Sequence, residues 1–97
     1  MDIIHHSPNE YGKWFVRLGP LAKATVAAEI EMLAARWPVG MPRVRNLSGD
    51  LFELRIMAHG LRLYFSVDDD EDEITFLTYG RKDTQSRDID RARGRMT

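Results

Sequence analysis

Between residues 51 and 67, apolar side chains recur at every second position, the pattern of a β-strand with one buried face. The positions are even-numbered at first and odd-numbered later: Phe52, Leu54 and Ile56, then Leu61, Leu63, Phe65 and Val67. Both sets share one face of a hairpin only if directly paired residues have numbers that sum to an odd value. A two-residue turn at His59-Gly60 meets this condition, with Gly60 supplying a positive φ. The sequence therefore predicts a β-hairpin that buries one face.

The second face of this hairpin is predicted to carry cations. A turn at His59-Gly60 pairs Arg55 with Tyr64 and Met57 with Arg62. Arg55 and Arg62 then become diagonal neighbours, which are about 7–8 Å apart in an antiparallel pair. Such a face is suited to an anionic ligand.

The rest of the chain predicts helices before the hairpin, and a strand and a helix after it. Ser7 is expected to cap the first helix, with Pro8 at its first position and Glu10 completing a capping box. The expected elements are a strand over residues 2–6, a helix from Pro8 to Leu18, a helix over residues 21–37, a loop containing Pro38, Gly40 and Pro42, the two hairpin strands, a strand over Ile74–Tyr79, and a helix from Asp83 or Thr84 to Arg93.

This order predicts a single α+β domain over residues 1–97. Two N-terminal helices should pack on one face of a small, mainly antiparallel sheet, followed by a C-terminal helix. A chain of 97 residues with 43% apolar and 30% charged residues has the composition of a soluble globular domain.

Composition also excludes several classes of protein. The chain has no cysteine, so it has neither disulfides nor a thiolate metal site. Its apolar runs are too short for a membrane span, and its first residues do not resemble a signal peptide. We therefore expect a cytoplasmic protein without membrane contact.

The net charge of −1 conceals an uneven distribution. Six of the 15 acidic residues form the run Asp68–Glu73, and outside this run 14 bases stand against nine acids. We expect the acidic run to be a solvated loop, because it lacks the glycine and ligand spacing of a calcium loop. The remaining surface can attract a polyanion despite the acidic total.

Three segments in this order resemble the RelE/ParE superfamily of bacterial toxins, in its HigB-like branch with phage-derived relatives. They are Leu51-Phe-Glu-Leu-Arg-Ile56, Gly60-Leu-Arg-Leu-Tyr-Phe65, and Gly80-Arg-Lys-Asp-Thr-Gln85 followed by Asp88-Ile89 and Ala92. The resemblance implies a RelE-like fold and the toxin of a type II toxin–antitoxin system. Most such toxins cleave mRNA on the ribosome without metal or other cofactor.

The resemblance also implies a hetero-oligomeric complex with a cognate antitoxin, often a helix-turn-helix protein encoded by an adjacent gene. Other members bind gyrase instead, and a phage-derived relative without toxicity is a third alternative.

The resemblance also assigns roles to residues of this chain. The expected catalytic residues are Arg62, Arg55, Lys82 and Glu53, and the expected RNA-binding residues are Arg81, Tyr64, Tyr79, His59 and Arg87. Two positions depart from the family pattern. Glu53 stands where RelE has lysine, and the RelE tyrosine position falls near Asp88. The location of an anion-binding site is therefore predicted more directly than its acid–base chemistry.

Structural roles compete with these assignments. Arg62 is expected to clamp phosphate, because an arginine held in a strand can grip two phosphate oxygens; without the resemblance, an arginine paired with an acid would be the simpler interpretation. Arg55 could instead form a cross-strand ion pair, and Glu53 could be a counter-ion rather than a general base. Tyr64 could pack on the sheet, and His59 could be a solvated turn residue.

Overall fold

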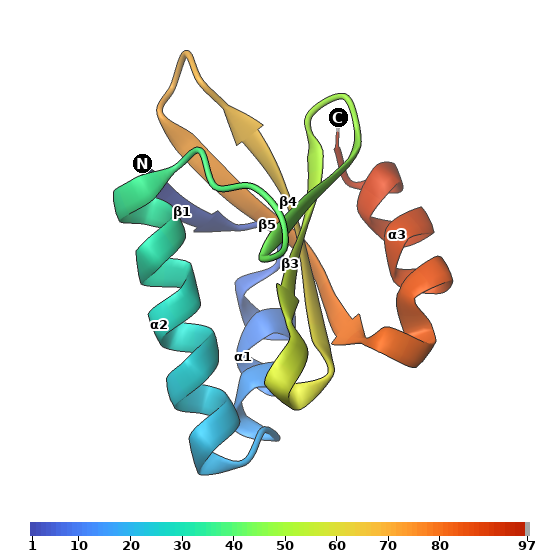
Figure 1. Ribbon diagram of the computed structural model, residues 1–97. Helices are drawn as coiled ribbons and strands as arrows, with labels where there is room; N and C mark the ends of the chain where they lie inside the picture. The colour runs from blue at the N-terminus through green and yellow to red at the C-terminus, as the bar shows by residue number, and fades with distance from the viewer. Residues whose placement is uncertain (97) are drawn as a thin grey trace.

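The computed structural model describes residues 1–96 and has the predicted α+β architecture (Figure 1). The last residue of the expected domain lies outside the described part. The elements are β1 (Asp2–His5), α1 (Pro8–Val16), α2 (Pro20–Arg36), β2 (Val44–Ser48), β3 (Leu51–Ile56), β4 (Leu61–Asp68), β5 (Glu73–Arg81) and α3 (Gln85–Gly94), with 3-10 turns at Met57–His59 and Lys82–Thr84. The sheet has the order β1-β5-β4-β3-β2, in which β1 is parallel to β5 and all other pairs are antiparallel.

The main core lies between the sheet and the two N-terminal helices. Val26, Ile30 and Leu33 form one buried stripe along α2, as the helical spacing predicts. They join the apolar residues of the alternating segment, including Leu54, Leu63 and Phe65, in one cluster. The predicted parity is therefore correct, because both apolar sets of the hairpin face the same core.

The predicted register of this hairpin is wrong by two residues. Met57, Ala58 and His59 form a 3-10 turn that ends at Gly60 with φ +64°, instead of a two-residue turn. A shift of two keeps the sum of paired numbers odd, so the faces are unchanged. Arg55 is now paired directly with Arg62, and Tyr64 with Glu53.

Strand β2 has no counterpart among the predicted elements. It pairs with β3 at one edge of the sheet, but a register shift between Asn46 and Ser48 interrupts the pairing. Because of that irregularity, Val44 and Leu47 do not follow a period of two, and the sequence hides the strand.

The start of α1 also differs from its prediction. Ser7 occupies the N-cap position, but its side chain makes no cap hydrogen bond. Glu10 does not close a capping box and instead reaches the C-terminal end of α3. Its carboxylate lies 3.3 Å from Nη1 of Arg91 in the helix and 2.7 Å from Nη1 of Arg95, just after it. The hydrogen bond that the Glu10 carboxylate accepts from Arg95 lowers the pKa of Glu10. The first and last helices are thus joined by ion pairs.

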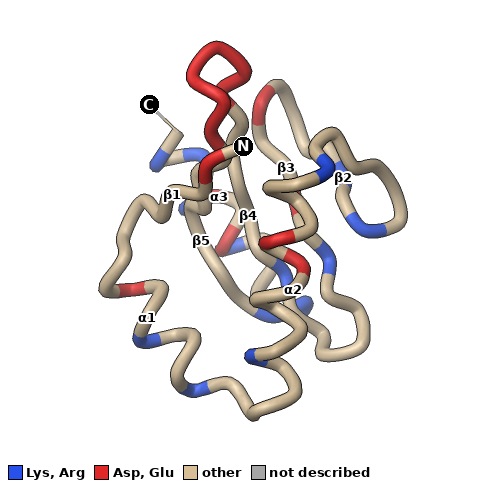
Figure 2. The backbone as a smooth tube through the Cα atoms, turned by 90° about the vertical axis from the view of Figure 1, so that its left-hand side faces the viewer, with Lys and Arg blue, Asp and Glu red and all other residues tan. Residues whose placement is uncertain are grey.

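The acidic run forms the loop between β4 and β5, at the top of Figure 2. Asp68 Oδ1 accepts backbone hydrogen bonds from Asp70 and Glu71 at 3.1 and 3.2 Å. Residues 68–72 are exposed, so the run is a solvated hairpin loop.

Two glycine-to-alanine substitutions should change stability in opposite directions. Gly60→Ala places a side chain at φ +64° and should lower the free energy of unfolding by about 1 kcal/mol. Gly12→Ala lies within α1 in open space and should raise it by up to about 1 kcal/mol, because alanine restricts the unfolded chain. Urea denaturation measures both. Equal effects of the two substitutions would contradict the assigned turn.

Candidate functional site

The predicted cationic face is not open, because α3 lies across it, on the side opposite α1 and α2 (Figure 1). A second, smaller apolar cluster holds the helix there: Leu51, Tyr64, Leu77 and Ala92, with Ile89 at its margin. Four buried polar residues lie between the sheet and α3 together with this cluster: Glu53, Arg62, Thr78 and Asp88. The candidate site is therefore a largely covered polar layer between the sheet and α3.

The close approach of α3 depends on Gly80. A Cβ atom at this position would lie 1.9 Å from Asp88 Oδ2 and 2.8 Å from Thr84 Oγ1. Thr84 donates a 2.6 Å hydrogen bond to Asp88 Oδ2, and Thr78 donates a 3.0 Å hydrogen bond to the Asp88 carbonyl. Asp88 is thus a buried residue that fixes the helix on the sheet.

Arg62 lies directly across the β4–β5 pair from Gly80. It is only 4% exposed, and its Nη1 donates a 3.0 Å hydrogen bond to the carbonyl of Leu61. Its Nε has no hydrogen-bond partner, and no carboxylate within residues 1–96 lies within 4 Å of its guanidinium. The interpretation of Arg62 as an arginine paired with an acid is therefore not supported. A buried guanidinium with spare donors can bind an anion.

Glu53 is held between two residues of different elements. Its Oε1 lies 3.7 Å from Arg55 Nε, and Gln85 at the start of α3 donates a hydrogen bond to its Oε2. Glu53 is fully buried, whereas the side chain of Arg55 is 24% exposed. Glu53 and Arg55 both belong to β3, so this ion pair lies within one strand and is not the cross-strand pair expected as the alternative role of Arg55.

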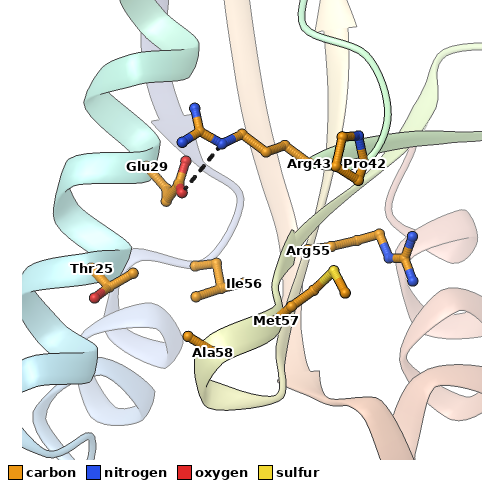
Figure 3. A pocket seen from close by; sticks show the side chains of 8 residues that line it. All are labelled: Thr25, Glu29, Pro42, Arg43, Arg55, Ile56, Met57 and Ala58. Atoms are coloured by element: carbon orange, nitrogen blue, oxygen red, sulfur yellow. Dashed lines mark ion pairs between the residues drawn. The ribbon is translucent and has the colours of Figure 1, made fainter.

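Arg55 also borders a hollow between α2 and the β2–β3 edge (Figure 3). On the α2 side of the hollow, Arg43 Nε lies 3.7 Å from Glu29 Oε1. The Arg55 side chain points away from this pair and from α2, toward the α3 side (Figure 3). Its charge is therefore directed to the candidate site.

Tyr64 does not have the exposed ring that base stacking requires. Its side chain is fully buried, and its hydroxyl has no hydrogen-bond partner within the described residues. Burial raises the pKa of Tyr64, and the nearby carboxylates of Glu53 and Asp88 raise it further, so the phenol stays neutral. In this structure Tyr64 packs beneath α3, which is the alternative role that the sequence left open.

Tyr79 lies away from the candidate site. Its ring belongs to the aromatic cluster on the α1 side of the sheet, at 5.0 Å from Tyr11 and 5.2 Å from Trp14. Its hydroxyl forms a 3.1 Å hydrogen bond with His5 Nδ1. Burial, mainly, raises the pKa of Tyr79. Tyr79 therefore lies on the face of the sheet opposite Arg62, and its expected contact with RNA would not involve the same surface.

The remaining predicted residues are Arg81, Lys82, His59 and Arg87. They lie around the end of the site that is formed by the β3–β4 turn and the turn after β5. Arg81 and Lys82 are exposed and line a hollow with His59 and Asp83. His59 Nε2 is 3.3 Å from Thr25 Oγ1, so its ring is within hydrogen-bond distance of α2. Arg87 lies on the outer surface of α3, with its Nε 3.8 Å from Asp88 Oδ1.

Gln85 and Thr84 were not predicted as part of the site. Thr84 and Asp88 are four residues apart, the spacing that aligns side chains on one face of a helix, and this was the available signal. No comparable signal points to the contact between Gln85 and Glu53, since the two residues are far apart in sequence.

Residues 1–96 contain no group of three or more His, Asp or Glu side chains that could hold a metal ion. None of the described helices is both long and apolar enough to cross a membrane.

Sequence comparison identifies the family. The family described as "Phage derived protein Gp49-like (DUF891)" matches residues 13–97. The chain belongs to the Gp49-like family. No curated protein matches its sequence.

The Gp49-like chain also resembles solved structures of a bacterial toxin. A double-arginine mutant of the E. coli toxin RelE in the free state has a TM-score of 0.74 and 16% identity, covering 99% of this chain and 97% of that one. The isolated E. coli RelE toxin has a TM-score of 0.66 and 14% identity, with 93% and 96% covered. RelE in the intact E. coli RelBE toxin–antitoxin complex has a TM-score of 0.66 and 14% identity, with 82% and 94% covered. These likenesses establish a RelE-like fold.

The contact between α3 and Gly80 can be tested by substitution. Gly80→Ala should lower the free energy of unfolding by about 1–3 kcal/mol, because the new methyl group overlaps buried Asp88. Adding Asp88→Ala should restore part of the loss, so the two effects should not add. Gly94→Ala, in open space near the end of α3, is the matched control and should not destabilise. Strict additivity would contradict the close contact.

The aromatic cluster should make stability depend on pH. Burial lowers the pKa of His5 from 6.5, so the unfolded chain binds a proton more readily than the folded one. Stability should therefore fall as the pH drops below 6.5 toward the lower pKa of the folded state. Chemical denaturation at several pH values should show that His5→Phe removes part of this dependence. His6→Phe, at an exposed neighbouring position, is the control, and equal behaviour of the two variants would rule out this role for His5.

Proposed function

We propose that this protein is the toxin of a type II toxin–antitoxin system, in the HigB-like branch of the RelE/ParE superfamily. Its activity would be metal-independent, ribosome-dependent cleavage of mRNA. The proposal is supported by the RelE-like fold and by the arginines of β3 and β4. The observation that carries it is Arg62, a buried cation with an unpartnered nitrogen and no carboxylate within 4 Å in the described chain.

The proposed reaction uses this charge on the scissile phosphate. The 2′-hydroxyl of one nucleotide attacks the adjacent phosphorus, the bond to the 5′-oxygen of the next nucleotide breaks, and a 2′,3′-cyclic phosphate forms. Arg62 and Arg55 stabilise the negative charge that develops on the non-bridging oxygens. They are directly paired across β3 and β4, so both can reach one phosphate.

Proton transfer is assigned to residues on either side of the arginines. Glu53 accepts the proton of the 2′-hydroxyl, because Arg55 and Gln85 hold its carboxylate in place. Lys82 at the end of β5 supplies a proton to the departing 5′-oxygen. Glu53 and Arg62 are covered in the free protein, so the phosphate enters beside the partly exposed Arg55, and the Gln85 end of α3 shifts to admit it.

The proposal also includes a partner and a compartment. E. coli RelE has been solved in a complex with its antitoxin RelB. We infer that this chain likewise forms a hetero-oligomer with a cognate antitoxin, a helix-turn-helix protein from an adjacent gene, in the cytoplasm.

The direct test is induction of the protein in bacteria, with mapping of mRNA 5′ ends. The wild type should arrest growth and create new ends inside reading frames. Arg62→Ala should lower cleavage by about 100-fold or more, the cost of losing a preorganised charge in the transition state. Arg36→Ala, at the exposed C-terminal end of α2, is the matched control and should behave as the wild type.

Other outcomes point to the alternative functions. DNA damage without new mRNA ends would indicate a gyrase-binding toxin, and lack of arrest by the wild type would indicate a relative without toxicity. Undiminished mRNA cleavage by folded Arg62→Ala would refute the role of the buried arginine.

A further inference from the structure

A groove beside the candidate site has no role in the reaction described above. It lies between the turn that joins α1 to α2 and the lower end of β5, and we call it the Arg17 groove. The residues that matter for its chemistry are Arg17, Leu18, Leu21, His59, Leu61 and Arg81. Figure 2 shows the acidic β4–β5 loop at the top of the molecule and the α1–α2 turn at the bottom, flanked by blue segments.

The Arg17 groove adjoins the candidate site around the end of the sheet, because it shares His59 and Arg81 with the hollow that Lys82 also lines. In the β4–β5 register, Gly80 is paired with Arg62, and the next pair is Arg81 with Leu61. The backbone N–H of Lys82 also donates a 3.0 Å hydrogen bond to the carbonyl of Gly60. Because adjacent residues of a strand point to opposite faces, Arg62 faces α3, whereas Leu61 faces the core beneath α1 and α2. An RNA strand that leaves Arg62 would therefore reach the groove around the end of the sheet, past Lys82 and Arg81.

The charges around the groove favour an anion. Arg17, Arg81 and Lys82 are exposed, and within residues 1–96 none of them has a carboxylate within 4 Å. Asp83 is the one acidic residue that lines the hollow adjoining the groove at His59 and Arg81. The first turn of α2 contains no acid, so the positive end of its helix dipole is not offset there by a side chain.

The surface between these cations is apolar. Leu21 is 77% exposed and Leu18 is half-buried, and both line the groove, whereas Leu61 forms its buried floor. A nucleotide has an anionic phosphate and a flat base with apolar faces, so a strand of unpaired nucleotides matches this combination.

We propose that the Arg17 groove binds the segment of single-stranded RNA next to the phosphate held by Arg55 and Arg62. The proposal rests on the function proposed above, and it adds a second contact region that defines the length of RNA the protein engages. Arg17 contacts a flanking phosphate, and Leu18 and Leu21 contact the neighbouring base.

The experiment measures binding rather than cleavage. The probes are fluorescent 2′-O-methyl RNA strands of about four and about twelve nucleotides, which cannot undergo attack by the 2′-hydroxyl and are within the range of known single-strand site sizes. Arg17→Ala should weaken binding of the long strand by roughly three- to tenfold, the effect of losing one charge-assisted contact. The slope of log affinity against log salt should fall by about 0.7. Binding of the short strand, held at Arg55 and Arg62, should not change, and Arg36→Ala should change neither.

A second variant separates RNA binding from folding. Leu21→Glu places a carboxylate in the first turn of α2, where it should stabilise the helix and maintain or raise Tm. The same charge should repel RNA and weaken binding of the long strand by at least as much as Arg17→Ala. Loss of RNA binding with an unchanged or higher Tm would therefore support the groove.

Several results would overturn the proposal. They are unchanged long-strand affinity in both groove variants, equal losses for the short and long strands, or competition by a polyglutamate peptide as effective as competition by unlabelled RNA. The last result would identify an acidic protein segment as the partner. Failure of the proposed function is a different result, namely unaltered mRNA cleavage by Arg62→Ala.

Discussion

The close packing of α3 on Gly80 determines what the polar face of the sheet can do. Because Gly80 has no side chain, the Asp88 carboxylate and the Thr84 hydroxyl can lie directly over β5. The helix consequently covers the strand positions that would otherwise be open to solvent, and it brings Gln85 onto Glu53. The shape of the site therefore depends on the close packing of α3 against Gly80 as well as on the sheet.

The same packing buries two charged groups, of which only Glu53 has an oppositely charged neighbour within 4 Å in the described chain. Glu53 accepts a hydrogen bond from Gln85 at Oε2 and lies 3.7 Å from Arg55, but its Oε1 has no hydrogen-bond partner within the described residues. Arg62 has lost its water without gaining an acidic partner within the described chain, and an unsatisfied buried charge costs more than a neutral group would. A chain that keeps such an arginine is less stable than its fold allows, which is expected where a charge serves binding or catalysis.

The sequence predicted the faces of the hairpin, because alternation fixes which side chains share a face. It could not predict the register, because a turn longer by two residues preserves the same alternation. The sequence did not predict strand β2, because its pairing is irregular. It also did not predict that α3 covers Tyr64, because α3 has few apolar residues. With Ile89 and Ala92 as its main apolar contacts, that helix looks solvent-exposed in sequence, and its position depends on the small size of Gly80.

The central claim is that Arg62 is retained for its charge and not for stability. The most direct measurement is the free energy of unfolding of Arg62→Met, which removes the charge and keeps much of the side-chain volume. We expect this variant to be as stable as the wild type or more stable, while it loses RNA cleavage. A large loss of stability, of several kcal/mol as when a buried ion pair is broken, would contradict the account and make Arg62 a structural residue.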